Sequence, residues 1–495
     1  MTRAAARAQD VRMSQSQVAT TDGSPTALTT TIRGVTVVDT RTGDLTPNMD
    51  ITITGPTITS ITPTQPARST SDIDARGKFA VPGYLEMHAH PLDLKDPTGS
   101  LELMLANGIT GFRQMAGSPE LLRRRAAGTL PLPEDSPALL ALPGSLLLPL
   151  NAGTAKAATA AVAEQHAAGA DFIKVAVVTP EVFFAAHQEA NRLGIPILGH
   201  LPVNIDVIEA SKRGLKCIEH LGPGLGILAA CSTDEQNVRA ALAAQRQIKL
   251  PPIKIPFMES ILKKIIHKII VNPTSRTSQD DINLLQHTID TFDEAKCEAL
   301  AEQFRTNGTW QCPTLIRERT SELCDAEEFR TDPNLRYVTP RTVKEWQSAA
   351  DTFAHRTPQA KATFRAAYAL QLRLTKLFDE AGVKMTAGSD ACGACWEVAG
   401  YALHQEFDEL ARAGLSPLRV LQMATLNGAE FLNSTATMGT VEPGKNADLV
   451  LLDANPIEDV KNLHRISGVV RAGRHYSPTA LNAIKQRVAD ARSVL

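Results

Sequence analysis

Aromatic residues are scarce in this sequence, since Phe, Trp and Tyr together make up 4% of its 495 residues. So few rings argue against a surface that stacks the bases of a single-stranded nucleic acid. The sequence also lacks an excess of charge of either sign, because its formal net charge is −2. A nearly neutral chain offers no basic surface for a polyanion or an anionic membrane. We therefore expect a small-molecule ligand and no nucleic-acid partner.

Long apolar runs are missing as well, and none reaches the roughly 18 residues that a membrane span requires. The seven cysteines are scattered and odd in number, which fits a reduced protein better than a disulfide framework. Residues 1–26 contain arginines but no apolar stretch typical of a secretory signal, and we expect them to form a disordered leader. Together these absences predict a cytoplasmic protein with no membrane partner.

Two segments rich in β-branched residues lie near the two ends of the chain. Residues 29–75 alternate β-branched with polar residues and are broken by Gly-, Asp- and Pro-rich turns. The stretch GTVEPGKNADLVLLDANP, which begins at Gly439, has the same character, and ISGVVRAGRHY follows it. We expect residues 27–80 and 437–495 to form one small β-sandwich domain built from both termini.

The middle of the chain alternates short apolar runs with longer helical patterns. Eight runs are candidate strands, namely AVPGYLEMH, GITGFRQM, PALLALP, DFIKVAVV, IPILGH, LKCIEH, GTWQCPTL and VKMTAGSD. The stretches TAKAATAAVAEQHAAG and PEVFFAAHQEANRLG between them end in glycines, where helices commonly stop. Strands that alternate with helices in this way predict an α/β fold, with a (β/α)₈ TIM barrel over residues 81–436.

The segment from about residue 224 to 308 is too long for one helix and its return to the sheet. Its stretch LPPIKIPFMESILKKIIHKII is amphipathic and basic. Such a helix is consistent with a lid or a subunit contact over the barrel mouth, and equally with an extra packing helix. The sequence therefore predicts a helical insertion near 224–308 and leaves its role open.

Polar side chains stand at the ends of several predicted strands, where the reactive residues of such barrels collect. They are His88, His90, Lys174, His200, His220 and Asp390. Each alone fits a structural role, such as a hydrogen-bonded core histidine or, for Asp390, a helix N-cap. The ordered set favours a metal site, because imidazoles and carboxylates bind Zn²⁺ and similar ions. Lys174 would join it only as a carbamate formed with CO₂, since an ammonium repels a metal.

The motifs HAH, DFIKV, GH, IEH and GSD, in this order, resemble the amidohydrolase superfamily. The resemblance covers nearly the whole chain from about residue 30. It includes the tail ATLNGAEFLN…MGTVEPGKNADLVLLDANPIEDV, which is typical of that superfamily's metal-dependent hydrolases. GADFIKV, LGIPILGHLP and GLKCIEHLG are most similar to the imidazolonepropionase and Xaa-Pro dipeptidase-like subgroup, to which ochratoxinase-type amidases are related.

This resemblance implies a centre of two divalent ions, Zn²⁺ first and Mn²⁺, Co²⁺ or Fe²⁺ as alternatives. One ion would be bound by His88, His90 and Asp390, the other by His200 and His220, with N-carboxylated Lys174 between them. A hydroxide shared by the ions would hydrolyse an amide bond. Asp390 would be the catalytic proton shuttle. Relatives are often multimers, so the resemblance also implies a homo-oligomer.

The substrate stays open, with an N-acyl amino acid, a dipeptide or an aryl amide favoured over a cyclic amide, an imidazolone or a lactone. A one-metal deaminase is disfavoured, because GHLPVNIDVIEAS has no glutamate before Glu209 and Lys174 would have no role. The alternative of another class is a non-catalytic scaffold, which the complete ligand set argues against.

The chain departs from the resembled pattern at several positions. Many relatives carry Arg-Asp after the second strand, where this chain has Arg113 and Gln114. Arg113 is a candidate substrate-binding residue, because a guanidinium can hold a carboxylate, although a structural ion pair is an equal alternative. Cys392 and Cys395 form a lone CGAC motif, which is weak support for zinc, and we expect loop thiols near the site.

Overall fold

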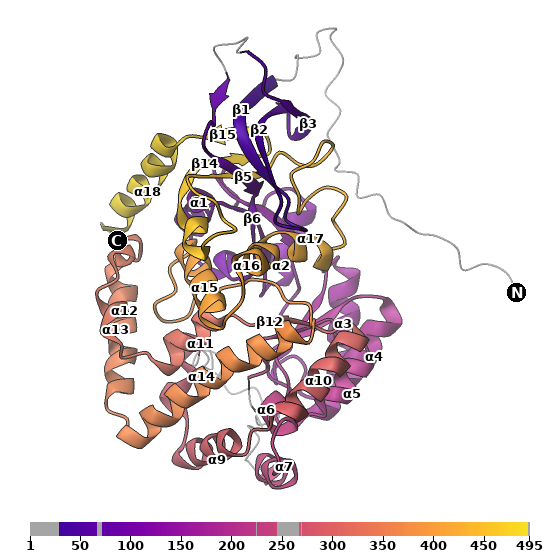
Figure 1. Cartoon of the computed structure of the whole chain (residues 1–495). Coiled ribbons are helices and arrows are strands. Elements are labelled where there is room, and N and C mark those ends of the chain that lie inside the picture. Colours follow the sequence, from indigo (N-terminus) through magenta and orange to yellow (C-terminus); the bar gives the residue numbers. More distant parts are fainter. Residues whose placement is uncertain (1–28, 67–71, 224, 245–266, 269, 494–495) are drawn as a thin grey trace, which may run out of the picture.

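The computed structural model in Figure 1 describes residues 29–66, 72–223, 225–244, 267–268 and 270–493. The predicted leader at residues 1–26 lies outside these ranges, and so does most of the amphipathic stretch at 250–270. Within the described ranges, no helix combines the length and the apolar character that crossing a membrane would demand.

Strands from both ends of the chain form one eight-stranded sheet, seen at the top of Figure 1, in the order β15-β14-β13-β5-β1-β2-β3 with β4 beside β1. Their bounds are β1 (Thr29–Val38), β2 (Leu45–Thr54), β3 (Thr57–Pro63), β4 (Ile73–Asp74), β5 (Phe79–Pro82), β13 (Leu449–Leu452), β14 (Ile466–Arg471) and β15 (Arg474–Tyr476). Their inward apolar residues share one buried cluster. The Ile58 amide donates to the Lys445 carbonyl and the Gly444 amide donates to the Ile58 carbonyl, which joins β3 to the segment before β13. The sheet therefore curls around this cluster.

Seven short parallel strands form two further sheets in the middle of the chain, in the orders β6-β7-β8 and β12-β11-β10-β9. Their bounds are β6 (Tyr84–Ala89), β7 (Ile109–Gln114), β8 (Ala138–Ala141), β9 (Ile173–Val175), β10 (Ile197–Gly199), β11 (Cys217–Glu219) and β12 (Trp310–Cys312). Except in β8, every residue of these strands is buried. This burial on both faces is typical of parallel strands that helices cover.

Single backbone contacts join the edges of these two parallel sheets. Leu147, beyond β8, forms a parallel bridge with Val175 of β9, and Gln311 of β12 forms one with Met385. Residues 383–390, predicted as the eighth strand, lack a regular ladder but continue from β12 to β6, where the Met87 amide donates to the Ala387 carbonyl. The structure thus shows an α/β fold in which eight extended segments run in the predicted order.

Helices follow most of the parallel strands and cover their outer faces (Figure 1). They are α1 (Thr98–Ala106), α2 (Pro119–Ala126), α3 (Ala155–Ala167), α4 (Pro180–Leu193), α5 (Val207–Lys212), α10 (Glu294–Asn307), α15 (Tyr401–Arg412), α16 (Pro417–Ala424) and α17 (Leu426–Phe431). The side chains of Thr154 and Thr179 cap the first turns of α3 and α4. Gly194, with a φ of 71°, ends α4 at the predicted stop.

Two groups of helices interrupt this alternation. The predicted insertion between β11 and β12 contains α6 (Gly226–Ala230), α7 (Glu235–Ala244) and α9 (Gln279–Asp290). A second group, which the sequence did not predict, contains α11 (Leu315–Glu322), α12 (Glu327–Arg330), α13 (Pro340–Ala354) and α14 (Pro358–Glu380). Short 3₁₀ helices are η1 (Pro91–Asp93), η2 (Pro273–Arg276), η3 (Pro333–Tyr337) and η4 (Val460–His464).

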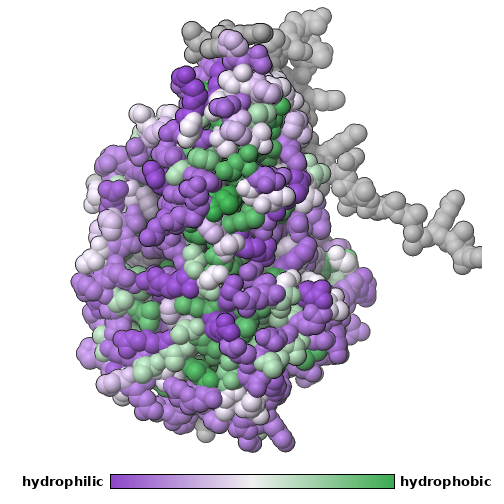
Figure 2. All heavy atoms as spheres, viewed as in Figure 1, coloured by the Kyte–Doolittle hydropathy of each residue, from purple (hydrophilic) through white to green (hydrophobic). Residues whose placement is uncertain are grey.

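The last helix, α18 (Pro478–Ser493), belongs by sequence to the predicted terminal domain but packs chiefly on α1 and η3. Leu481 and Ile484 of α18 share an apolar cluster with Leu105 of α1 and with Val469 of β14. The terminal sheet and the α/β part are therefore held together by this helix. On the face shown in Figure 2, hydrophobic residues gather along the middle between hydrophilic flanks.

Candidate metal centre

The six predicted ligands lie at or next to the carboxyl ends of the parallel segments. They are His88 and His90 at the end of β6, Lys174 in β9, His200 after β10, His220 after β11 and Asp390 at the end of 383–390. Because these ends meet at one edge, the side chains converge. The imidazole centroid of His220 lies 4.5 Å from that of His88 and 5.1 Å from that of His200.

Asp390 connects three of the histidines. Its Oδ1 lies 3.1 Å from Nε2 of His88 and 3.1 Å from Nε2 of His90, while its Oδ2 lies 4.0 Å from Nε2 of His220. Metal–ligand bonds of about 2.0–2.2 Å at tetrahedral angles place two ligand atoms roughly 3.3 Å apart. The spacing at Asp390 fits ligands that share an ion.

The Nδ1 atom of each of these three histidines has its own partner. It lies 2.6 Å from Glu219 Oε2 in His88, 2.9 Å from Asp93 Oδ2 in His90 and 2.6 Å from Thr314 Oγ1 in His220. A partner at Nδ1 orients an imidazole and leaves Nε2 free for a metal, as outer hydrogen bonds do in metal sites. Three imidazoles therefore present Nε2 toward one carboxylate.

The backbone at the centre takes conformations that few residues adopt. His220 has a φ of 55° and Asp390 a φ of 65°, both in the left-handed region. Such conformations cost of order 1–3 kcal/mol each and are common at functional sites. Gly388, in the GSD motif, has no room for a side chain, since an added Cβ would lie 2.7 Å from the Cβ of His88.

Burial sets the protonation of the predicted ligands. Burial and the nearby Lys174 lower the pKa of His200 to about 3, and burial holds the pKa of His220 well below its usual value. Neutral imidazole is the form that binds a metal. His90 differs, because hydrogen bonds to Asp390 and Asp93 outweigh its burial and raise its pKa to about 9. A metal ion would have to displace a proton from His90.

Lys174 is buried, and its Nζ has no hydrogen-bond partner in the described structure. Burial lowers the pKa of this amine. An unpaired buried amine is costly, and only the neutral amine is nucleophilic toward CO₂. The environment of Lys174 fits the predicted N-carboxylation.

Glu219 is a site residue that the sequence reasoning missed, although it stands in the quoted IEH motif. Strand alternation would turn Glu219 away from His220. The left-handed backbone of His220 breaks that alternation, so both side chains reach His88. The signal was an acidic residue in a strand whose every residue is buried.

Arg113 is buried beside the centre and pairs with one of its residues. Its Nη2 donates to Glu219 Oε1 at 2.9 Å, its Nε donates to the Met87 carbonyl at 2.6 Å, and its side chain is 0% exposed. Glu219 occupies one side of this guanidinium, and the role of Arg113 in holding a substrate carboxylate stays a prediction. The structural ion pair, which was the alternative, is present.

Arg113→Met should lower the free energy of unfolding by about 3–5 kcal/mol, because it leaves the Glu219 carboxylate buried without its guanidinium. Urea denaturation followed by circular dichroism would measure the loss. Adding Glu219→Gln to the variant removes the stranded charge and should recover part of that stability. A single variant within about 1 kcal/mol of the wild type would contradict a role for this pair in stability.

Two further residues complete the surroundings of the centre. Gln114, which stands where many relatives carry Asp, donates from Nε2 to Asp93 Oδ1 at 3.1 Å and so supports the partner of His90. Arg317, from the unpredicted helix α11, places Nε 3.2 Å from Asp390 Oδ2. Sequence reasoning had no strand end from which to find Arg317.

The cysteines of the CGAC motif do not pair with each other. Cys395 Sγ lies 3.7 Å from Sγ of Cys324, and both thiols are free and buried. Burial raises the pKa of the Cys392 thiol to about 12. Neither cysteine is a ligand of the centre described above.

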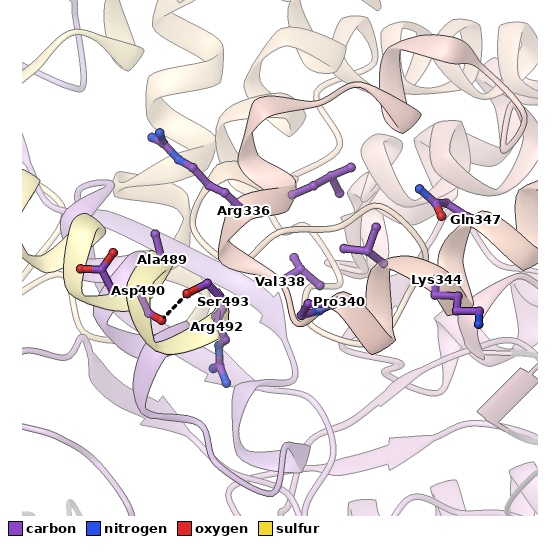
Figure 3. A pocket seen from close by; sticks show the side chains of 11 residues that line it. Arg336, Val338, Pro340, Lys344, Gln347, Ala489, Asp490, Arg492 and Ser493 are labelled. Carbon is purple, nitrogen blue, oxygen red and sulfur yellow. Dashed lines mark hydrogen bonds between the residues drawn. The ribbon is translucent and has the colours of Figure 1, made fainter. Parts of the chain in front are cut away.

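A surface cavity of about 700 Å³ lies elsewhere, between α18 and the segment from η3 into α13 (Figure 3). Its lining includes Arg336, Lys344 and Arg492, and it contains none of the predicted site residues. The candidate centre is therefore defined by converging side chains and not by this cavity.

Comparisons with known proteins agree with this geometry. The amidohydrolase family model matches residues 371–475. Adenine deaminase 4 of Rhizobium meliloti (strain 1021) is 38% identical over 60 residues, which span only 12% of this chain and 9% of that protein.

Solved structures match over much more of the chain. Bottromycin amidohydrolase has a TM-score of 0.64 at 23% identity, covering 94% of this chain and 90% of its own. A Xaa-Pro dipeptidase with bound methionine has a TM-score of 0.58 at 19% identity, and the match covers 91% of this chain and 100% of that one. A. niger ochratoxinase has a TM-score of 0.54 at 15% identity, and the match covers 91% of this chain and 96% of that one. At these identities the likeness shows the fold. The family match is confined to residues 371–475, and the shared fold extends the likeness to amidohydrolases over most of the rest of the chain.

Proposed function

We propose that the chain is a metal-dependent amidohydrolase that cleaves an amide bond of a small molecule. The observation that carries this proposal is the convergence of three Nε2 atoms on Asp390, each imidazole being held at Nδ1 by a separate partner. The unpartnered Nζ of Lys174 beside them supports a centre of two ions. A one-metal deaminase would leave this buried amine without a role.

The donor set fits divalent ions such as Zn²⁺, since it consists of neutral imidazoles and a carboxylate. His88, His90 and Asp390 would hold one ion, and His200 and His220 the other. Lys174 would contribute through its N-carboxylated form. When bound, such ions lower the pKa of water to about 7 and polarise a carbonyl oxygen.

The residues of the chain itself provide the proton transfer and the orientation. Asp390 Oδ1 faces His88 and His90, and the carboxylate can accept a proton from water and return it to the leaving amine. Arg317 holds the other oxygen of Asp390 and so fixes the direction of this transfer. Glu219, Asp93 and Thr314 keep three imidazoles from rotating.

We also infer that the two parallel sheets and residues 383–390 form one closed barrel of eight segments. The bridges at Val175 and at Gln311 and the bond between Met87 and Ala387 support this closure. Favoured substrates are N-acyl amino acids, dipeptides and aryl amides. The similarity to a Xaa-Pro dipeptidase supports an open-chain amide over a cyclic amide or a lactone.

Elemental analysis of the purified protein should find about two divalent ions per chain. Removal of the ions by a chelator should abolish amide hydrolysis, and adding Zn²⁺ or Mn²⁺ should restore it, because the imidazole and carboxylate donors stay in place. One ion per chain would favour the deaminase alternative. Full turnover with less than about a tenth of an ion per chain would exclude a metal-dependent reaction.

A further inference from the structure

Most large hydrophobic side chains that the described residues expose lie beyond parallel strands, on the side of the candidate centre. Leu150 is 58% exposed, Val177 56%, Val203 44% and Ile270 44%. The fifth, Leu45, is 39% exposed and lies on β2 of the terminal sheet. Single exposed hydrophobic residues are ordinary, but four at one end of the fold indicate a binding surface.

Three of these residues occupy consecutive strand-to-helix loops, and we call Leu150, Val177 and Val203 the apolar rim. Val177 stands three residues after Lys174, and Val203 stands three residues after His200. The rim therefore lies on loops that directly follow two predicted ligands.

Backbone contacts keep these loops side by side. The amide of Val177 donates to the carbonyl of Leu147, which stands three residues before Leu150. The amide of His200 donates to the carbonyl of Val175 at 3.0 Å. The loops after β8, β9 and β10 are thus adjacent along one side of the centre.

The charge around the centre is unevenly distributed. Residues 143–154 and 176–179, which form the first two loops of the rim, contain no charged residue. Asp93, next to His90, and Arg317, next to Asp390, carry charge elsewhere around the centre. A bound molecule would meet a neutral, apolar surface at these loops and charged groups elsewhere.

We propose that the apolar rim binds a large aliphatic or aromatic group of the substrate next to the amide bond. This inference rests on the proposed hydrolase function and narrows its substrate to amides that carry such a group on one side. The occupant is a small molecule, because a protein seated on these loops would also cover the residues around Lys174 and His200. Burying apolar surface supplies the binding energy, and each methylene contributes up to about fourfold in affinity.

Binding of two ligand ladders to the purified full-length protein tests the proposal by calorimetry. One ladder runs through straight-chain carboxylates from acetate to decanoate, and the other through free amino acids from glycine to phenylalanine. Both are products of amide cleavage, so they are not hydrolysed during the measurement. Affinity should rise about two- to fourfold per methylene in at least one ladder.

Val177→Asn and Val203→Asn should flatten that rise, whereas Leu45→Asn, at an exposed hydrophobic position on the terminal sheet, should leave it unchanged. A flat ladder in the wild-type protein, or a slope that survives in both rim variants, would overturn the proposal. If affinity does not rise along either ligand series, and the rim variants also have a lower molecular mass in solution than the wild type, the rim is instead a contact between two copies of this chain.

Turnover of N-acyl amino acids, measured in parallel, separates this inference from the function on which it rests. If affinity rises along the ligand series but no amide is hydrolysed, the proposed hydrolase function is refuted and the rim remains an apolar ligand site. Hydrolysis with flat ladders would refute the rim alone. Metal content should stay the same in all rim variants, since none of these residues is a predicted ligand.

Discussion

Asp390→Asn should lower kcat for amide hydrolysis by about 10³-fold or more and change KM little. A carboxamide cannot take a proton from water, and general acid–base catalysis contributes about 10²–10⁴-fold. The substitution also removes the negative charge that His88 and His90 face at 3.1 Å, which adds to the loss. Steady-state kinetics on an N-acyl amino acid would measure both parameters.

Asp93→Asn provides a graded comparison within the same site. Asp93 supports His90 through Nδ1 and is not among the predicted ligands. Removing an outer partner of this kind typically lowers metal affinity or activity by about 10–100-fold. If Asp390→Asn were no more damaging than Asp93→Asn, Asp390 would not be the proton shuttle.

Lys174→Ala should lose activity and most of the bound metal. The side chain is buried among the predicted ligands, and truncation removes the group that would carry the bridging carboxylate. Short-chain carboxylates such as acetate or propionate should restore part of the activity by filling the space. Metal content and turnover of this variant are each measured with and without the added carboxylate.

The matched control is Lys216→Ala. Lys216 is a half-buried lysine whose pKa is also lowered by burial, but it precedes β11 and lies over the rings of Trp310 and Phe431. It stands at the opposite end of that strand from His220, so its loss should leave the metal content unchanged. Unchanged metal content and turnover in Lys174→Ala would contradict the proposal that a carbamate on Lys174 bridges two ions.

Residues at the carboxyl ends of parallel strands could be predicted from the sequence. Carboxyl ends of parallel strands share one edge, so polar residues such as His88, His200 and Asp390 could be grouped by their positions in the strand pattern. The α/β order followed from the same alternation. Regular strand pairing at 383–390 did not appear, because that segment is bonded at isolated positions to β12 and β6.

The remaining site residues depend on geometry that a periodic pattern does not contain. Glu219 and His220 both reach His88 because the left-handed backbone of His220 turns its imidazole toward the side that Glu219 faces. The sequence leaves Arg113 between a substrate carboxylate and a structural ion pair, because its charge is visible in the sequence while its buried partner Glu219 is not. Arg317 belongs to a group of helices that the strand pattern does not predict.

The shared terminal sheet also determines when this protein can fold. In that sheet Phe79 pairs with Leu452, so two neighbouring positions are separated by most of the polypeptide. During synthesis β1 to β5 emerge early, and the edge of β5 that pairs with β13 stays unpaired until β13 to β15 have left the ribosome. Contacts so distant along the chain slow folding and prolong exposure to aggregation. Chaperone dependence should therefore concentrate on the N-terminal strands of the nascent chain.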